Sequence, residues 1–456
     1  MELSMEQPLP SASGKGTALL QVTSEAKKQV RLAAPLIVGC LLQNVIQMIS
    51  VMFVGHLGEL ALASASMATS FAIVTGFSFL TGMSCSLETL CGQAFGANQD
   101  HMLGVYKQRA MVVLGVASVP IAAVWANTGW ILLRLGQDPE IAAGAGLYIR
   151  WMLPSLLFYG WLQCHVRFLQ TQKIVVPMMV SSGVTAANHV LVCWALVYKL
   201  DMGIKGAAVA NSISFLTNVS ILALYVRLSP SCKTTWTGFS CQAFDDIPAF
   251  MKLAVPSAIM VCMEWWSFEV LVLLAGLLPN PKLSTAVLSI CTRVSNELGA
   301  GRPRAALLAA RVVILLAFLV GTSEGLLLIL VRHLWGHAYS KDQEVVASVA
   351  KMMLILAPSV LFDGLQYVLS GIVRGCGRQK IGALVNFVAY YLVGIPAALV
   401  FTFVCHLGVQ GLWLGIVSGL VTQTLLLLVI SFGTNNWEKQ AMNAKDRIFT
   451  SLPTEP

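Results

Sequence analysis

Charged residues are scarce in this chain. Among 456 residues there are 29 Lys and Arg and 21 Asp and Glu, so charged side chains make up 11% of the sequence and hydrophobic ones 57%. A soluble domain carries about 25% charged residues. The scarcity of charge excludes a chain built of soluble domains, and it leaves no room for a sizeable soluble domain beside other parts.

Motifs for catalysis and for nucleotide or metal binding are absent as well. The turn at residues 299–301 follows no strand and lacks the Lys-Ser/Thr pair of a phosphate loop, so nothing indicates that ATP drives this protein. No nucleophile–His–acid set stands out, and the 11 Cys form no CxxC pair or His/Cys cluster typical of a metal site. The sequence predicts neither an enzyme nor a bound cofactor or metal ion.

The net charge of +8 follows the membrane-orientation rule and does not indicate nucleic-acid binding. Lys and Arg gather in alternate loops, while the intervening loops at 55–59 and 405–408 carry none. We therefore expect both termini to be cytoplasmic. The basic positions on that side are Lys15, Lys27, Lys28, Arg31, Lys107, Arg109, Lys173, Lys233, Arg302, Arg304, Arg374, Arg378, Lys380, Lys439, Lys445 and Arg447.

Apolar stretches long enough to cross a bilayer recur along the chain. Each must be helical, because lipid offers no hydrogen-bond partner to the backbone. The sequence therefore predicts an all-α polytopic membrane protein. The expected spans are 31–54, 63–90, 109–134, 141–168, 174–198, 205–228, 248–277, 305–334, 344–372, 381–404 and 409–432, with a shorter apolar stretch at 283–296.

The second half of the sequence repeats the first. The pairs are 31–35 with 252–256, 92–97 with 296–301, 154–160 with 358–364, 172–174 with 379–381 and 203–206 with 408–411. An even number of spans in each copy makes the copies parallel, with two packed lobes around a central cavity, as in secondary transporters. The expected divisions are a disordered cytoplasmic N-terminus at 1–24, a first lobe at 25–228, an inter-lobe loop at 229–246, a second lobe at 247–433 and a cytoplasmic tail at 434–456.

Acidic side chains inside the spans are the first functional candidates, because ionisable groups in a bilayer are rare and costly. When the prolines of the two repeats are aligned, Gln43 falls on Glu264 and Tyr159 falls on Asp363. The first lobe is thus neutral where the second is acidic, and a carboxyl group in an apolar cavity can hold either a proton or a cation. Proton coupling is therefore predicted at Glu264 and Asp363. Glu88, near a span end, is expected at the membrane interface in a structural role.

Aromatic and amide side chains near these acids are candidates for a substrate cavity. Trp faces attract organic cations, and polar residues within a span either line a cavity or bond a neighbouring helix. Glu269 is a weaker candidate than Glu264, because five residues turn a helix through about 140°. The candidate cavity residues are Gln43, Asn44, Tyr159, Trp265, Trp266 and Glu269.

Five short segments carry a family signature: 55–60 (GHLGEL), 88–97 (ETLCGQAFGA), 264–266 (EWW), 293–301 (RVSNELGAG) and 374–380 (RGCGRQK). Together they resemble the multidrug and toxic compound extrusion (MATE) family, and within it the plant-type detoxification proteins. The resemblance implies two six-helix lobes and export of organic compounds by cation antiport. It also implies coupling acids on the seventh and tenth helices, where this chain has Glu264 and Asp363. The first-helix Asp of the bacterial type is absent, and Gln43 and Asn44 stand in its region.

The expected partners are small organic substrates, protons and the lipid bilayer, with no nucleic acid. We expect a monomer in the vacuolar or plasma membrane, and the natural substrate stays open. One alternative is a lipid-linked oligosaccharide flippase of similar shape, whose cavity should carry Arg and Lys for pyrophosphate. Another is a transport-impaired splice or gene-model variant.

The eighth helix is predicted to be damaged. Repeat partners are 221 positions apart at Gly55 and Gly276 but 203 apart at Ala97 and Ala300, so about eighteen residues are missing between them. The remaining stretch, 283–296, reaches about 21 Å as a helix, which is short of the roughly 30 Å hydrocarbon core. We therefore expect weak or absent transport by the chain as written.

Overall fold

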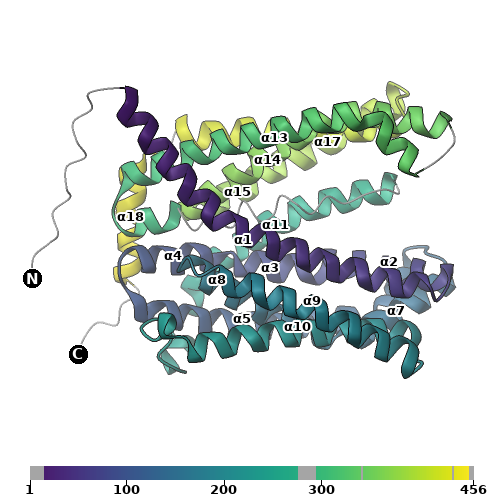
Figure 1. The fold of residues 1–456 in the computed structure, drawn as a ribbon, viewed down its shortest axis with the longest axis horizontal. Helices are drawn as coiled ribbons and strands as arrows, with labels where there is room; N and C mark the ends of the chain where they lie inside the picture. Colours follow the sequence, from purple (N-terminus) through teal and green to yellow (C-terminus); the bar gives the residue numbers. More distant parts are fainter. Residues whose placement is uncertain (1–14, 276–293, 340–342, 434–435, 451–456) are drawn as a thin grey trace, which may run out of the picture.

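The computed structural model describes residues 15–275, 294–339, 343–433 and 436–450. Within these residues the chain folds into helices, and no strand occurs. Figure 1 shows the blue and teal helices α2 to α10 of the first half in a lower layer and the green helices α13 to α17 of the second half in an upper layer, with α11 between them. Helix α1 runs diagonally from the upper left into the lower layer, and α18 lies at the left-hand end. This arrangement agrees with two lobes formed by the two sequence repeats.

The first half consists of long helices that run back and forth through the bundle. One span extends without a loop from Glu59 to Gly96, and another is bent by 54° between α7 and α8. The bend lies at Pro154, because proline cannot continue the hydrogen-bond ladder of the preceding turn. The elements are α1 (Lys15–Gly55), α2 (Glu59–Ala72), η1 (Ile73–Phe77), α3 (Ser78–Ser84), α4 (Ser86–Gly96), α5 (Asp100–Ala126), α6 (Thr128–Arg134), α7 (Pro139–Met152), α8 (Pro154–Thr171), α9 (Val176–Trp194), η2 (Ala195–Lys199) and α10 (Gly203–Leu228).

The second half begins after a loop that holds two short 3₁₀ turns, η3 (Pro230–Cys232) and η4 (Cys241–Phe244). A short helix at 294–299 precedes α13. The elements are α11 (Ile247–Ala275), α13 (Pro303–Tyr339), α14 (Gln343–Gly375), α15 (Gln379–Asn386), η5 (Phe387–Gly394), α16 (Ile395–Leu399), η6 (Val400–Val404), α17 (Val409–Leu428), η7 (Val429–Gly433) and α18 (Trp437–Thr450).

The helices confirm the predicted membrane spans over the described residues. There, 10 helices are long and apolar enough to cross a membrane, or up to 11 if the bent pair α7–α8 is one span. They account for every predicted span except the stretch at 283–296. That stretch lies outside the described residues, apart from its last three positions in the helix 294–299.

Each half has an apolar core of its own. The largest core cluster draws on α1 to α10, and separate clusters are formed by α13 to α18. Helix α11 is shared, because Phe250, Ala254 and Ala258 belong to the first cluster while Met260 accepts a hydrogen bond from Asn386 of α15. This central position makes α11 the natural link between the halves.

The loop between the halves is held by the first half. Gln108 of α5 donates to the Gly238 carbonyl (2.6 Å) and accepts from the Ser240 amide (2.9 Å). Arg109 donates to the Gln242 carbonyl (3.1 Å). The chain then reaches α11 through Asp246, whose φ is +50°. These hydrogen bonds hold the inter-lobe loop against α5 up to the residues just before α11.

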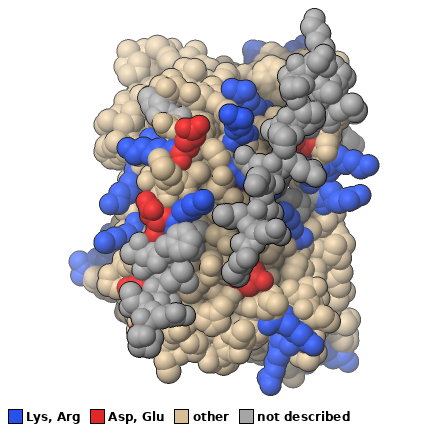
Figure 2. Space-filling model, turned by 90° about the vertical axis from the view of Figure 1, so that its left-hand side faces the viewer, with Lys and Arg blue, Asp and Glu red and all other residues tan. Residues whose placement is uncertain are grey.

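Lys and Arg side chains gather on the end of the bundle where α18 lies (Figure 2). We call this end, which also holds the inter-lobe loop and the turn at Gly377 and Arg378, the basic end. The basic end matches the side that the sequence assigns to the cytoplasm, because basic loops stay on the cytoplasmic side.

Three cysteines outside the membrane test this orientation. Cys241 and Cys405 are exposed, whereas Cys232 is buried, and burial raises the pKa of the Cys232 thiol. Maleimides react with exposed thiolates. In sealed vesicles, we expect an impermeant maleimide to modify Cys241 from the cytoplasmic side and Cys405 from the opposite side, with Cys232 unmodified. Peptide mass spectrometry measures each site, and modification of Cys241 and Cys405 from the same side would contradict the orientation.

Candidate functional site

Glu264 and Asp363 come together in the second half. Glu264 lies on α11 with 4% of its surface exposed, and Asp363 lies on α14. The two carboxyl groups interact electrostatically. Gln366, one turn beyond Asp363, donates through Nε2 to Asp363 Oδ1 at 3.1 Å. The structure thus joins the two acids that the sequence repeat singles out.

Two tyrosines that the sequence analysis did not select complete this group. The Tyr367 hydroxyl donates to the Glu264 carboxylate, and Tyr390 of η5 faces both acids. We call Glu264, Asp363, Gln366, Tyr367 and Tyr390 the acid cluster. Helical spacing could have identified Gln366 and Tyr367, since residues three and four positions apart share a face. Within the described residues no group of three or more His, Cys, Asp and Glu could hold a metal ion.

One oxygen of Glu264 lacks a hydrogen-bond partner. Its Oε1 is buried without such a contact, although Tyr367 donates to the carboxylate. Asn386 fixes this part of α11, because it donates to the Met260 carbonyl (2.8 Å) and accepts from Gln423 (2.8 Å). Arg374 also interacts electrostatically with the Glu264 carboxyl group. A buried carboxyl group in a fixed position, with one oxygen that receives no hydrogen bond, is suited to gain and lose a proton, since burial disfavours its charged form.

The first half presents a neutral, aromatic group at the equivalent position. The Tyr159 hydroxyl is hydrogen-bonded to Thr81 (2.7 Å). The Tyr159 ring lies 4.6 Å from that of Phe77 and 5.3 Å from that of Phe215 between ring centroids. Since Tyr159 corresponds to Asp363 in the repeat, the halves differ here in charge, as their sequences do.

The other candidate cavity residues differ in their surroundings. Asn44 donates to the Cys40 carbonyl of its own helix (2.9 Å). Trp266 donates to the Val74 carbonyl in η1 (2.7 Å) and so links the two halves. Gln43 and Trp265 are half-buried. The Glu269 side chain lies outside the described residues. The polar groups of Asn44 and Trp266 are therefore hydrogen-bonded to backbone carbonyls, whereas within the described residues the structure gives Gln43 and Trp265 no such bond that would turn them from a substrate.

Glu88 is buried within the protein, and its contacts agree with the structural role that the sequence predicts. It is fully buried and forms an ion pair with Arg167 of α8 at 2.8 Å, where Arg167 is also buried. The helix continues to Gly96, so Glu88 lies two turns inside the span end. The pair lies beside Cys85, whose sulfur accepts from Arg167 (3.8 Å) and from Arg374 of α14 (3.3 Å).

Breaking this ion pair should destabilise the protein. We expect Glu88→Gln to lower the free energy of unfolding by about 3–5 kcal/mol, because it leaves Arg167 as an uncompensated buried charge. Thermal unfolding of the purified protein measures the loss, with Glu59→Gln on the exposed start of α2 as the control. The double variant Glu88→Gln/Arg167→Met should recover much of the stability, and equal midpoints for Glu88→Gln and wild type would contradict the pairing.

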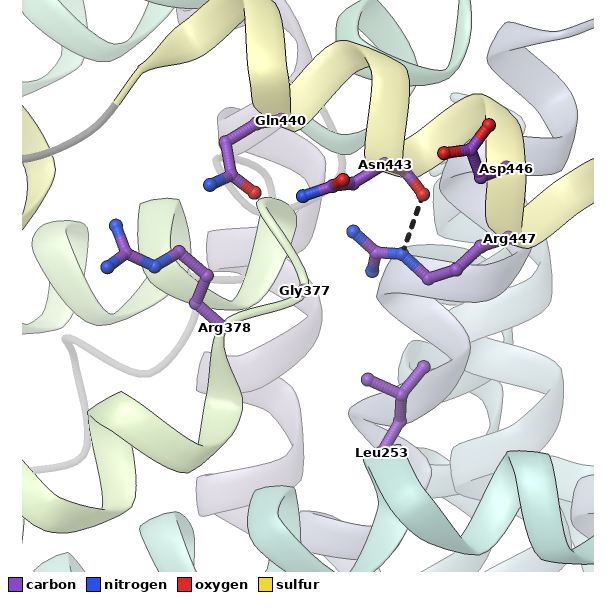
Figure 3. A pocket seen from close by; sticks show the side chains of 7 residues that line it. All are labelled: Leu253, Gly377, Arg378, Gln440, Asn443, Asp446 and Arg447. Atoms are coloured by element: carbon purple, nitrogen blue, oxygen red, sulfur yellow. Dashed lines mark hydrogen bonds between the residues drawn. The ribbon is translucent and has the colours of Figure 1, made fainter.

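A pocket of about 490 Å³ lies at the basic end, away from the acid cluster (Figure 3). Arg447 of α18 donates to the Cys376 carbonyl (3.1 Å). Gly377 has a φ of +72°, a conformation that favours glycine, and the Arg447 guanidinium packs directly against it. The pocket thus marks where α18 is anchored to the second half. It is lined by Leu253, Gly377, Arg378, Gln440, Asn443, Asp446 and Arg447.

Comparisons with known proteins agree over almost the whole chain. A family model described as MatE matches residues 35–195 and 288–400. Protein DETOXIFICATION 16 of Arabidopsis thaliana is 54% identical over 449 positions, covering 94% of this chain and 92% of that protein. A crystal structure of the eukaryotic MATE transporter AtDTX14 is 41% identical, with a TM-score of 0.86 over 94% of this chain and 99% of its own. The bent form of the Vibrio cholerae MATE transporter VcmN shares the fold, with 16% identity and a TM-score of 0.78 over 94% of this chain and 99% of its own.

Proposed function

The chain belongs to the MatE family of membrane transporters, and we propose that it exports small organic compounds in exchange for protons. It is an integral multi-pass membrane protein and not an enzyme. The proposed substrates are xenobiotics or secondary metabolites, with cations favoured by the acids. We place it as a monomer in the vacuolar or plasma membrane.

The observation that carries the proposal is the acid cluster. Glu264 and Asp363 lie together in the second half, while the equivalent positions of the first half hold Gln43 and Tyr159. Two interacting carboxyl groups resist being charged at the same time. Either a proton or an organic cation can neutralise the charge of this pair of carboxyl groups, and binding of one displaces the other. Such mutual exclusion is the basis of antiport.

Aromatic side chains support an organic substrate. Tyr159, Phe77 and Phe215 form one group of rings in the first half, and ring faces attract cations and apolar surfaces. We propose that the substrate binds between these rings and the acid cluster, with Gln43 and Trp265 beside it. A flippase is less favoured, since pyrophosphate needs available cations and the buried Arg167 is already paired with Glu88.

Reconstituted protein tests the proposal. In liposomes with a proton gradient, we expect accumulation of a fluorescent organic cation, with proton release that depends on the substrate. An uncoupler should abolish both. Accumulation that persists without a gradient would exclude proton antiport, and transfer of a labelled lipid-linked pyrophosphate instead of the cation would favour the flippase. Because the shortened eighth helix is expected to weaken transport, the assay includes the extended variant described in the Discussion.

A further inference from the structure

The two halves meet at the basic end through contacts that obey the symmetry of the sequence repeat. The segments 92–97 and 296–301 are compared in the register that aligns Ala97 on Ala300, the one used above for the eighth helix. In this register Gly96 corresponds to Gly299 and Gln93 corresponds to Asn296. Gln93 and Gly96 lie on α4, and their partners Asn296 and Gly299 lie on the helix 294–299. We call Gln93, Gly96, Asn296 and Gly299 the seam.

Backbone packing in the seam is reciprocal. A Cβ atom on Gly96 would overlap the carbonyl oxygen of Asn296, and one on Gly299 would overlap the carbonyl oxygen of Gln93. Gly96 thus packs on Asn296 and Gly299 packs on Gln93, and each of these two contacts is the repeat equivalent of the other. Only a residue without a side chain allows backbones to approach this closely.

The side-chain hydrogen bonds of the seam are reciprocal too. Gln93 donates to the Gly375 carbonyl at the end of α14 (3.4 Å), and Asn296 donates to the Thr171 carbonyl at the end of α8 (3.0 Å). Thr171 and Gly375 are themselves repeat partners when Pro154 is aligned on Pro358. Each half thus sends one amide across to the same carbonyl position of the other half, as in a two-fold symmetric interface.

Further contacts close the same region. Thr89 donates to the Arg374 carbonyl (2.8 Å) and accepts from Gln379 (2.8 Å), and Ser295 donates to the Thr89 carbonyl (3.0 Å). One turn deeper, Cys85 is 1% exposed, beneath the Arg374 side chain of the opposite half. The seam therefore covers the interior at the basic end.

We propose that the seam is the cytoplasmic gate of this transporter. It separates when the interior opens toward the cytoplasm, and it re-forms when the interior opens to the other side. Because every contact crosses between the halves, a relative rotation of the halves breaks all of them together. The proposal of a gate depends on membership of the transporter family and on the contacts of the seam, and it does not depend on whether protons drive transport.

The rate at which the buried Cys85 thiol is modified reports how often the seam opens. We expect Gly96→Ala and Gly299→Ala each to increase the rate of Cys85 modification by N-ethylmaleimide about tenfold, because an obstructed closed state raises the open population. The full-length protein is modified in detergent, and the peptides are quantified by mass spectrometry. The matched control is Gly183→Ala, whose Cβ would lie at an ordinary 3.6 Å from Leu42, and its rate should equal that of wild type.

Two further readouts separate gate opening from unfolding. Cys164 and Cys193 are buried within the first half and should stay unmodified. If they react in the alanine variants, Gln93→Met and Asn296→Leu replace them, since these remove only the amide at similar volume and should also raise the Cys85 rate. An unchanged Cys85 rate in a folded variant of either kind, or an increase from only one half of the seam, would overturn the proposal.

Discussion

In the extended variant, in which the eighth helix is restored as described below, proton-driven export falls to the background of empty liposomes when Glu264 is replaced by Gln, and also when Asp363 is replaced by Asn. This is the largest effect that we expect. Each replacement keeps the shape of the side chain and removes the proton that can be exchanged. The loss should affect both substrate accumulation and substrate-dependent proton release in the liposome assay. Buried carboxyl groups that interact with one another are typical of functional sites.

The control for this result is Glu59→Gln at the exposed start of α2, which should transport as the parent does. Thermal unfolding shows whether Glu264→Gln and Asp363→Asn are folded. Normal export by a variant with both acids neutralised would contradict proton coupling in the second half. The seam is tested by the rate of Cys85 modification, which does not depend on Glu264 or Asp363. The proposal of proton coupling and the proposal of a gate can therefore fail separately.

The second large effect concerns the eighth helix. We expect weak or absent transport by the chain as written, and recovery when about eighteen apolar residues are inserted after Cys291 so that a full span can form. Transport of a fluorescent cation into liposomes measures the recovery. A polar Gly/Ser insert of the same length is the control and should not restore transport. Equal transport with and without the apolar insert would contradict the prediction.

Two comparisons support a missing segment. The alignment with DETOXIFICATION 16 extends over 449 positions, although 94% of the 456 residues of this chain takes part, so about 20 positions of it have no counterpart here. The first MatE match begins at residue 35, whose repeat partner is residue 256, yet the second match begins only at residue 288. The number of unmatched positions in the DETOXIFICATION 16 alignment is close to the roughly eighteen residues that the repeat lacks.

The sequence by itself determined the spans, the two copies and the two acids of the second half. Span length and apolar composition are local properties set by the thickness of the bilayer, so they can be read without knowing any contact. The difference between Gln43 and Glu264, or between Tyr159 and Asp363, follows from aligning the copies. For the same reason Gly96 and Gly299 could be recognised as partners, though not as residues in contact.

Only the tertiary structure decided which side chains meet. Tyr390 reaches the acids from η5, and Arg167 neutralises Glu88 from another helix. Thr89 and Arg374 are hydrogen-bonded although 285 positions separate them in sequence. Helical periodicity fixes which face a residue occupies but not which helix packs on that face, because this depends on how the ridges of neighbouring helices fit together. The burial of Glu88 and the reciprocal contacts of the seam follow from that fit.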